Sequence, residues 1–256
     1  MDYLARDSLH AGVPYGRNFD QQRLIGSLCL NRAGDGLAIT DKGKTAAEMM
    51  VFARYVMFSE VYWHHAVRSA TAMLQRAFYL LRKQLPLDSL FQLTEQPMID
   101  HLIDSAGTGA AAELLSGLFG TSRRLYKRLA QFSYFQERAT YQQLARRPYP
   151  WLTDCAAALA DRCGHALGHQ VAPHHILIDA PPIKLEVEFN VDVYFSRENR
   201  YRSLGEVSPV VQTLAKKQFD DYVKRVRILV HPDQRDALAS LTNFPEMLHA
   251  AACDVG

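Results

Sequence analysis

The chain has 256 residues, with 29 Lys and Arg against 27 Asp and Glu and a formal net charge of +2. Hydrophobic residues make up 48% and charged residues 22%, a composition that excludes a disordered or fibrous chain. The charge is too small to indicate nucleic-acid binding by itself, and four cysteines without C-x-x-C spacing favour a reducing cytoplasm over a disulfide framework.

The first ten residues, MDYLARDSLH, alternate charged and apolar side chains and lack the apolar core of a signal peptide. No stretch approaches the roughly 18 apolar residues that a membrane span requires. The best candidate, residues 49–58, is interrupted by Arg54. We therefore expect a soluble cytoplasmic protein with no membrane partner.

The first elements are short, and a long helix follows them. Residues 33–36, Ala-Gly-Asp-Gly, predict a hairpin turn leading into a strand at residues 37–40. Thr45 and Glu48 have the spacing of a capping box, and no Gly or Pro interrupts the helical periodicity before Pro86. The pattern predicts one continuous helix over this stretch.

The remainder changes character near residue 173. Helices are predicted at residues 88–93, 98–105, 109–118, 122–137 and 151–167, the last ending at Gly168. Beyond them we predict strands at 176–178, 185–195 and 223–230, a turn at 197–200, and helices opening at Ser208 and Pro232. The fold class is therefore mainly α, with a helical body over residues 1–172 and a small α+β subdomain over residues 173–256.

The first candidate site lies at the start of the chain. If these residues are helical, Tyr3 and Asp7 share one face, and Asp2 and Arg6 share another. An aromatic ring beside a carboxylate suits a sugar, because the ring packs on it while the carboxylate accepts hydrogen bonds from its hydroxyls. On spacing alone, a surface helix with one ion pair is the favoured alternative.

The long helix carries a second candidate. Helical spacing places five side chains on one stripe, with Tyr62 at its edge: Arg54, Phe58, Val61, His65 and Arg68. Guanidinium groups are natural phosphate ligands. The alternative, favoured on the pattern alone, is a core helix whose arginines reach out to solvent.

Two further clusters have weaker signals. A zinc site is one interpretation of five residues in a short stretch, although they lack a second ligand pair at finger spacing: Cys163, His165, His169, His174 and His175. A basic tract interleaved with aromatic residues suggests an effector nucleotide or single-stranded nucleic acid: Arg123, Arg124, Lys127, Arg128, Arg146 and Arg147. A solvated helix face with its Tyr and Phe side chains inward is the favoured interpretation of that tract.

Four sequence blocks occur in order along the chain. They are D-Y-L-x-R-D-S-x-H-x-G-V-x-Y-G from Asp2, A-R-Y-x-M-F-x-x-V-Y-x-H-H-x-x-R from Ala53, I-L-I-D-x-P-P-I-K from Ile176 and L-x-E-V-S-P-V-V from Leu204. Together they resemble the C-terminal half of bacterial HD-superfamily phosphohydrolases. The blocks are similar to those of the dNTP triphosphohydrolases that carry a sterile alpha motif and an HD domain.

The resemblance implies a role for individual residues. The aromatic of the first block touches the nucleotide, which falls on Tyr3, and its last Asp meets the ribose hydroxyl, which falls on Asp7. In the second block the phosphate contact falls on Arg54. Tyr62 takes the place of a tyrosine at the nucleotide, and His64 lies beside the same pocket.

The resemblance also implies a divalent metal, held in the family by a His, a His-Asp pair and a further Asp. No His in this sequence is followed by Asp, and the family's last ligand lies three residues before the D-Y of the first block, which would place it upstream of Met1. We therefore expect no metal ligand, no catalytic residue and no cofactor in this chain, although a complete family member uses the metal to activate water.

These observations predict a truncated portion of an HD-family phosphohydrolase, which binds a (deoxy)nucleoside triphosphate but lacks the metal site. The alternative is a non-catalytic nucleotide-binding or oligomerisation module, and nucleic-acid binding through the basic tract is a weaker third. The expected partners are the nucleoside triphosphate, a separate HD-containing polypeptide and further copies of the chain. Self-association would bury apolar residues such as Leu4 and Leu9, which we expect to be exposed.

Overall fold

The computed structural model describes residues 1–182, 191–214 and 223–255. It confirms the mainly α fold class with a small α+β part. The chain divides into two compact units, each built from two separate segments. The first unit comprises Met1–His64 and Lys184–Lys224, and the second comprises His65–Ile183 and Arg225–Gly256. The boundary predicted at residues 172/173 falls inside the second unit.

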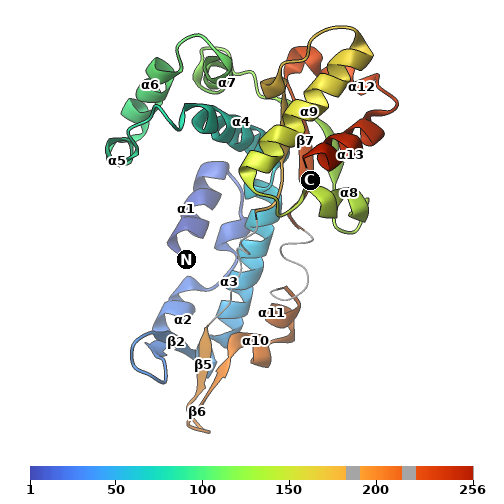
Figure 1. Ribbon diagram of the computed structural model, residues 1–256. Helices are drawn as coiled ribbons and strands as arrows, with labels where there is room; N and C mark the ends of the chain where they lie inside the picture. Colours follow the sequence, from blue (N-terminus) through green and yellow to red (C-terminus); the bar gives the residue numbers. More distant parts are fainter. Residues whose placement is uncertain (183–190, 215–222, 256) are drawn as a thin grey trace. The chain divides into compact units, whose positions relative to one another are not determined.

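The first unit combines helices with a small mixed sheet (Figure 1). Its helical elements are α1 (Asp2–Ala11), η1 (Tyr15–Arg17), α2 (Gln21–Gly26), η2 (Asp41–Gly43), α3 (Lys44–Met57), η3 (Phe58–Tyr62), α10 (Leu204–Val207) and α11 (Pro209–Thr213). Its strands are β1 (Leu28–Leu30), β2 (Leu37–Thr40), β5 (Asp192–Phe195) and β6 (Arg200–Ser203), in the order β1-β2-β5-β6. β2 and β5 are parallel, and the other pairs are antiparallel.

Local signals explain most of this unit. The predicted hairpin joins β1 to β2, with Gly34 in the left-handed region at φ 76° and the side chain of Asn31 accepting hydrogen bonds from the backbone N–H groups of Asp35 and Gly36. The turn predicted at residues 197–200 joins β5 to β6. Ser208 caps α11 by accepting a hydrogen bond from the N–H of Val211. Of the strand predicted at 185–195, residues 185–190 lie outside the described residues.

The prediction of one continuous helix from Thr45 to Pro86 is wrong. α3 ends at Met57, η3 is a π-helical segment in which the N–H of Trp63 bonds to the carbonyl of Phe58, and α4 starts only at His65. Thr45 is not the N-cap either, because the helix starts one residue earlier and Glu48 pairs with Lys44. The wider turn needs neither Gly nor Pro, so the sequence carries no signal for it.

The second unit places a three-stranded antiparallel sheet between helices. Its helical elements are α4 (His65–Leu81), α5 (Leu87–Leu90), α6 (Glu95–Ala106), α7 (Ala110–Phe119), α8 (Arg138–Leu144), α9 (Tyr149–Leu167), η4 (Pro173–His175), η6 (Pro232–Gln234), α12 (Arg235–Ala239) and α13 (Phe244–Asp254). The strands are β3 (Lys127–Phe132), β7 (Val226–Val230) and β4 (Ile176–Asp179), with β7 in the centre.

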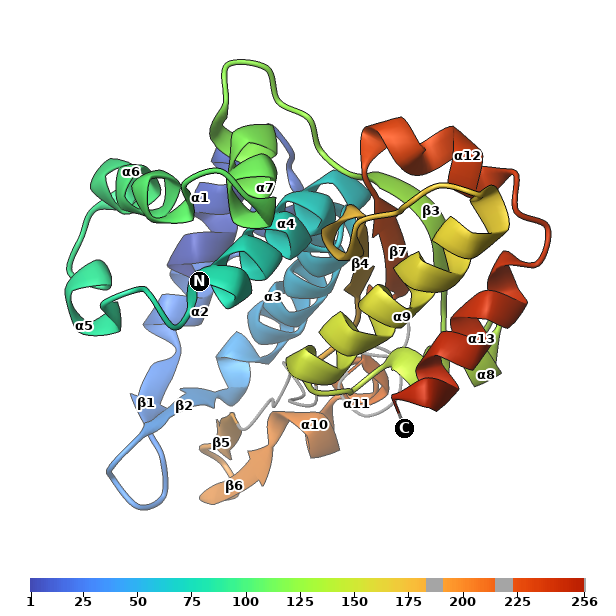
Figure 2. The ribbon, with the colours of Figure 1, turned by 45° about the horizontal axis from the view of Figure 1, so that its top comes forward.

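Alternation along β4 and β7 explains why both faces of this sheet are covered. Ile176 and Ile228 belong to the apolar cluster formed with α9 and α13, which lie side by side in Figure 2. Leu177 and Leu229 belong to the cluster formed with α4 and α7. Every residue of both strands is buried, including Asp179 of β4 and Arg227 of β7, which lie opposite each other in the register.

Two predictions for the second unit are wrong. The helix predicted at residues 122–137 is the strand β3, because pairing with β7 overrides the local preference of Lys127–Phe132. The single last helix predicted from Pro232 is broken into η6, α12 and α13. Within the described residues, no helix is long and apolar enough to cross a membrane.

Candidate nucleotide-binding site

Helix α1 presents two different faces within the first unit. Leu4 and Ser8 are buried, whereas Tyr3 remains 38% exposed and Asp7 is half-buried. Asp2 and Arg6 form the predicted i,i+4 ion pair at 2.9 Å on the solvent side. The expectation that Leu4 is exposed is therefore wrong, while Leu9 is exposed as expected. The inward face fixes the helix, and the Tyr3–Asp7 stripe stays accessible.

The loop after α1 holds the helix in this orientation. Gly12 ends α1 in the left-handed region at φ 68°. The Ser8 hydroxyl donates to the carbonyl of Val13 and accepts from the N–H of Gly16 at 3.1 Å. A Cβ on Gly16 would lie 2.1 Å from the carbonyl oxygen of Leu4, so only glycine permits this approach. The small and polar residues of the first sequence block thus position its Tyr and Asp.

A row of side chains follows α3 into η3. The guanidinium carbon of Arg54 lies 5.4 Å from the ring centroid of Phe58. Phe58 in turn contacts the ring of Tyr62 edge to face, with centroids 5.0 Å apart. α3 buries Ala53 and Met57 on the adjoining positions, which fixes the helix from which this row projects.

A hydrogen bond joins the row to α1. The hydroxyl of Tyr62 donates to Oδ2 of Asp7 at 2.6 Å. Burial, this hydrogen bond and the negative charge of Asp7 raise the pKa of Tyr62 well above its ordinary value, while the charge of Arg54 acts in the opposite direction. We call Tyr3, Asp7, Arg54 and Tyr62 the Tyr–Asp cluster. Tyr62 is therefore a neutral donor at physiological pH.

His64 stands at the edge of this arrangement. It lies between η3 and α4, is exposed, and its backbone N–H bonds to the carbonyl of Val61. Three of the five residues predicted for the nucleotide, Tyr3, Asp7 and Arg54, thus act electrostatically on a fourth, Tyr62, and the fifth is two residues along the chain from Tyr62.

Arg68, which the sequence places on the same helical stripe as Arg54, belongs to the second unit and pairs with Asp179. In the second unit its Nε donates to Oδ2 of Asp179 at 3.1 Å, and its Nη2 contacts Oδ1. Asp179 is 3% exposed and also lies 3.8 Å from Nη1 of Arg227. Burial lowers the pKa of Arg227 to about 10 despite the carboxylate. The second and third sequence blocks therefore meet in a buried ion pair.

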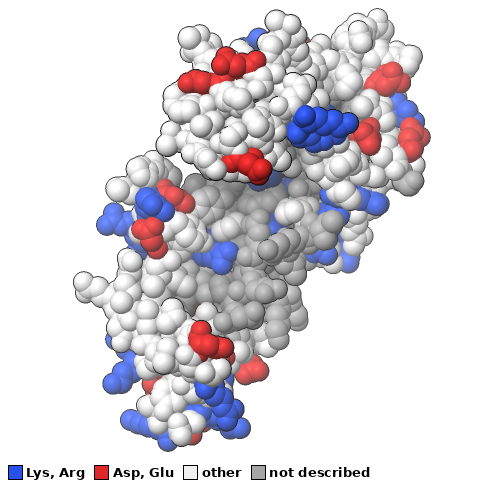
Figure 3. Space-filling view, turned by 60° about the vertical axis from the view of Figure 1, so that its left-hand side comes forward, with Lys and Arg blue, Asp and Glu red and all other residues white. Residues whose placement is uncertain are grey.

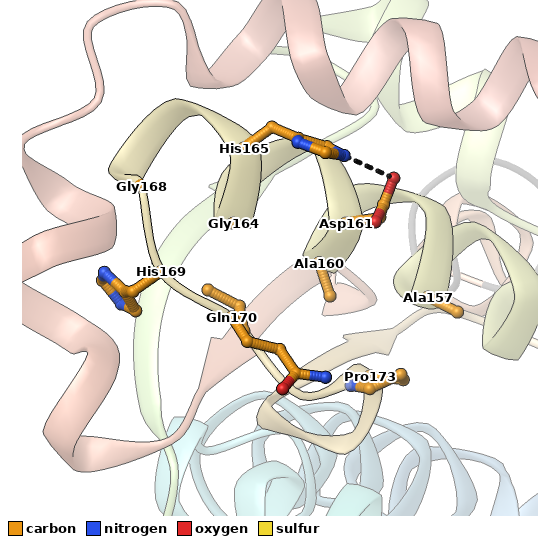
Figure 4. A pocket seen from close by; sticks show the side chains of 10 residues that line it. Ala157, Ala160, Asp161, Gly164, His165, Gly168, His169, Gln170 and Pro173 are labelled. Carbon is orange, nitrogen blue, oxygen red and sulfur yellow. Dashed lines mark ion pairs between the residues drawn. The ribbon is translucent and has the colours of Figure 1, made fainter.

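The five-residue Cys/His stretch is divided between different surroundings. Cys163 is buried in the core, which raises its pKa to about 11. His165 and His169 line a pocket of about 520 Å³, yet Figure 4 shows His165 turned toward Asp161, at 3.5 Å, with His169 apart from it. His174 and His175 instead contact Glu113 of α7, which the sequence pattern did not include.

Two aromatic residues of the basic tract are buried, as the favoured interpretation of that tract requires. Tyr126 and Phe132 are buried, and Arg124 pairs with Asp233 at 2.6 Å. On the face presented in Figure 3, the described Lys and Arg side chains are interspersed with Asp and Glu.

Comparison with known proteins gives the family. The model of the HD associated region matches residues 19–243, which is most of the chain. The chain belongs to this family. Its fold is shared with a hypothetical protein from Aquifex aeolicus, with a TM-score of 0.62 and 21% identity over 93% of this chain and 55% of that one. A phosphohydrolase from Bacteroides thetaiotaomicron has a TM-score of 0.52 and 19% identity over 90% of this chain and 60% of that one.

This HD associated region also has similar relatives of greater length. An uncharacterized protein of Methanocaldococcus jannaschii is 30% identical over 222 residues, covering 84% of this chain and 44% of that protein. An uncharacterized protein of Bacillus subtilis is 35% identical over 79 residues, covering 31% of this chain and 18% of that protein. The chain therefore spans less than half the length of these curated relatives.

The described residues of the Tyr–Asp cluster do not form the ligand set of the metal that the HD relationship implies. No His in the chain is followed by Asp. Among the described residues, the one group of His, Cys, Asp and Glu close enough to hold an ion lies in the second unit, on Glu113, His174 and His175. The Tyr–Asp cluster of the first unit contains a single carboxylate and no imidazole, so we assign no metal-dependent step to it.

Proposed function

We propose that this HD associated region is the nucleotide-recognising portion of a phosphohydrolase similar to the dNTP triphosphohydrolases with a sterile alpha motif and an HD domain. The observation that carries the proposal is the 2.6 Å hydrogen bond from Tyr62 to Asp7. It joins two sequence blocks far apart in the chain and gathers a ring, a carboxylate, a phenol and a guanidinium in one unit. These four groups match the parts of a nucleoside triphosphate.

The α1 side of the cluster supplies contacts to the nucleoside. Tyr3 is exposed enough to stack on the sugar or base. Asp7 uses one carboxylate oxygen to accept from Tyr62, and a carboxylate with two oxygens retains capacity to accept from a ribose hydroxyl. The neutral Tyr62 keeps Asp7 oriented, because its hydroxyl stays a donor throughout the physiological pH range.

The α3 side supplies the contact to phosphate. Arg54 is half-buried, and its guanidinium packs against Phe58. A planar guanidinium held in place by an aromatic ring loses less side-chain entropy when it forms bidentate hydrogen bonds to phosphate oxygens. His64, exposed just beyond η3, adds a second contact at the edge of the nucleotide.

Hydrolysis needs groups that this chain does not supply. In this proposal the divalent metal and the water that it activates belong to an HD site outside these 256 residues, in the same protein or in a separate HD-containing polypeptide. This chain binds and orients the nucleotide, and further copies of it assemble into a homo-oligomer in the cytoplasm.

A binding experiment tests the proposal. Titration calorimetry with each of the four dNTPs, and with the matching deoxynucleosides, measures recognition without any chemistry. We expect Arg54→Ala to weaken triphosphate binding roughly 10- to 100-fold while changing nucleoside binding little, because only the phosphate contact is lost. Arg6→Ala, an exposed arginine of the same unit, is the matched control and should change neither. Equal losses for triphosphate and nucleoside would contradict the phosphate role of Arg54.

The absence of a His-Asp pair supports a second candidate, a non-catalytic nucleotide-binding module. The two differ in what an added HD-containing polypeptide does. If mixing the chain with such a polypeptide and Mg²⁺ or Mn²⁺ releases triphosphate from dNTP, the enzyme portion is supported. If nucleotide binding persists and no release occurs with any HD-containing relative, the binding module is favoured.

A further inference from the structure

Four side chains from three elements of the second unit converge at one end of its sheet. Glu113 lies on the first turn of α7, His174 and His175 form the end of η4, and His231 directly follows β7. We call these four residues the Glu–His cluster. They lie outside the Tyr–Asp cluster, and the nucleotide proposal makes no use of them.

The sheet itself brings two of the imidazoles together. β4 and β7 pair antiparallel with Ile176 opposite Val230, so the residues just beyond this pair, His175 and His231, are cross-strand neighbours. The N–H of His231 bonds to the carbonyl of His175 at 2.9 Å. Their rings stack with centroids 4.7 Å apart and planes at 25°. This juxtaposition therefore follows from backbone pairing.

All three imidazoles direct Nε2 at the same carboxylate. Nε2 of His174 lies 2.7 Å from Oε2 of Glu113, and Nε2 of His175 and of His231 each lie 3.2 Å from Oε1. The ligand atoms of Glu113, His174 and His175 all lie within 4.8 Å of one another. Bonds of about 2.0–2.2 Å to a tetrahedral ion place its ligand atoms roughly 3.3 Å apart, so only small side-chain shifts are needed.

Access and surroundings are also suitable. The histidine side chains are 10–18% exposed, whereas Glu113 is 41% exposed, so an ion can enter past the carboxylate. The ring of Tyr126 meets His231 edge-on at 5.4 Å, and its buried hydroxyl has no hydrogen-bond partner among the described residues. In the structure the imidazoles share hydrogen bonds to the carboxylate of Glu113. A bound cation would replace these hydrogen bonds by direct bonds between the ion and its ligands.

We propose that the Glu–His cluster is a binding site for a zinc-class divalent cation. Two imidazoles, those of His174 and His175, and the Glu113 carboxylate form a nitrogen- and oxygen-donor set typical of Zn²⁺, with His231 beside it on the same carboxylate, whereas Mg²⁺ and Ca²⁺ prefer sites made of oxygen ligands. The site joins α7, η4 and the end of β7, and thus ties the helical layer of the second unit to its sheet.

Titration of the metal-free full chain tests the site directly. We expect calorimetry to show about one Zn²⁺ bound per chain and Co²⁺ to develop the visible absorption of a low-symmetry nitrogen-ligated ion. Mg²⁺ should not compete. Because Zn²⁺ displaces protons from the imidazoles, we also expect proton release on binding and an affinity that falls as the pH is lowered below 7.

Variants locate the ion. We expect Glu113→Gln and His174→Ala each to weaken Zn²⁺ binding at least roughly 10-fold and to change the Co²⁺ spectrum. His165→Ala and His169→Ala are matched controls from the same stretch of chain and should leave both unchanged. Glu113→Gln keeps the size of the side chain and a hydrogen-bonding oxygen, and circular dichroism of each metal-free variant verifies that the fold is retained.

Three results would overturn the site. They are no Zn²⁺ binding by the folded wild-type chain, equal affinity in Glu113→Gln and wild type, or equal losses in the cluster and control variants. The outcome is independent of the nucleotide proposal, because Arg54→Ala should bind Zn²⁺ as the wild type does.

Discussion

Arg54 and Arg68 lie on one helical stripe in the sequence, but the structure gives them different environments in different units. Arg54 is half-buried in the first unit, over Phe58 and within electrostatic reach of Tyr62. Arg68 belongs to the second unit, where it forms a two-point contact with the buried carboxylate of Asp179. The same residue type, in the same sequence block, serves a candidate ligand site in one case and the packing of a unit in the other.

The two arginines differ in how far the charge of the neighbouring carboxylate is already compensated by other groups of the protein. Asp179 is 3% exposed and is contacted by two arginines, so its charge is compensated inside the protein. Asp7 is half-buried and accepts a hydrogen bond from a neutral phenol, so this contact leaves its negative charge uncompensated. A resemblance that spans both arginines therefore does not assign both to a ligand.

The largest effect is expected at Asp179. Asp179→Ala should lower the free energy of unfolding by about 3–5 kcal/mol, because removing one member of a buried ion pair leaves buried guanidinium charge behind. Urea denaturation followed by circular dichroism measures it. Asp161→Ala, which removes an exposed aspartate of the same unit, should change stability by less than about 0.5 kcal/mol. Similar values for the two variants would remove the basis for a packing role of Arg68.

The next largest effects are expected when each of the two arginines is replaced by alanine. Arg68→Ala should cost about 2 kcal/mol of stability, because Arg227 is then the one cationic partner of Asp179 among the residues that the structure describes. Arg54→Ala should cost less than about 1 kcal/mol and instead weaken binding of triphosphates. Denaturation and dNTP titration of both variants give a two-by-two comparison. If Arg68→Ala weakened nucleotide binding as much as Arg54→Ala does, and left the free energy of unfolding unchanged, the distinction between the two environments would be wrong.

Elements with local signals were predictable from the sequence. The hairpin at Gly34, the end of α9 at Gly168 and the Ser208 cap each depend on residues adjacent in the chain. The end of α3 was not predictable, because a π-helical turn at Phe58–Tyr62 arises without Gly or Pro. β3 was mistaken for a helix, since its strand conformation depends on pairing with β7, about 100 residues later.

The two candidate sites were predictable to different degrees. Tyr3, Asp7, Arg54 and Tyr62 were found through the resemblance of their sequence blocks, and the structure brings them together in one unit. Of the Glu–His cluster, the sequence singled out His174 and His175 within the five-residue Cys/His stretch but missed Glu113 and His231, because each of these lies more than 50 residues from that pair. The register that aligns the His174-His175 pair with His231 is a tertiary property, which no local pattern in the sequence carries.

A smaller effect is expected from removing one oxygen atom at the Tyr–Asp cluster. Tyr62→Phe keeps the edge-to-face contact with Phe58 but deletes the donor to Asp7. We expect a loss of about 1 kcal/mol in stability and a several-fold weaker affinity for nucleotide, because Asp7 is no longer oriented. Tyr201→Phe, which removes a neutral hydrogen bond to the carbonyl of Leu30 in the same unit, is the control and should leave nucleotide affinity unchanged.

The smallest and most specific effect is the ionisation of Tyr62 itself. Burial, and then the hydrogen bond and charge of Asp7, raise its pKa above the ordinary value of 10.0. Because the pKa is higher in the folded state, the stabilisation that comes from holding Tyr62 in its neutral form is complete below pH 10 and is lost as the pH rises through the folded-state pKa. In NMR titrations with ring-labelled tyrosine, we expect the Tyr62 signal, assigned by its loss in Tyr62→Phe, to show no midpoint near pH 10. Because burial is the largest cause, Asp7→Asn should lower the pKa of Tyr62 only part of the way toward 10. A pKa of Tyr62 that returned fully to 10 in this variant would show that the Asp7 carboxylate, and not burial, is the main cause of the shift.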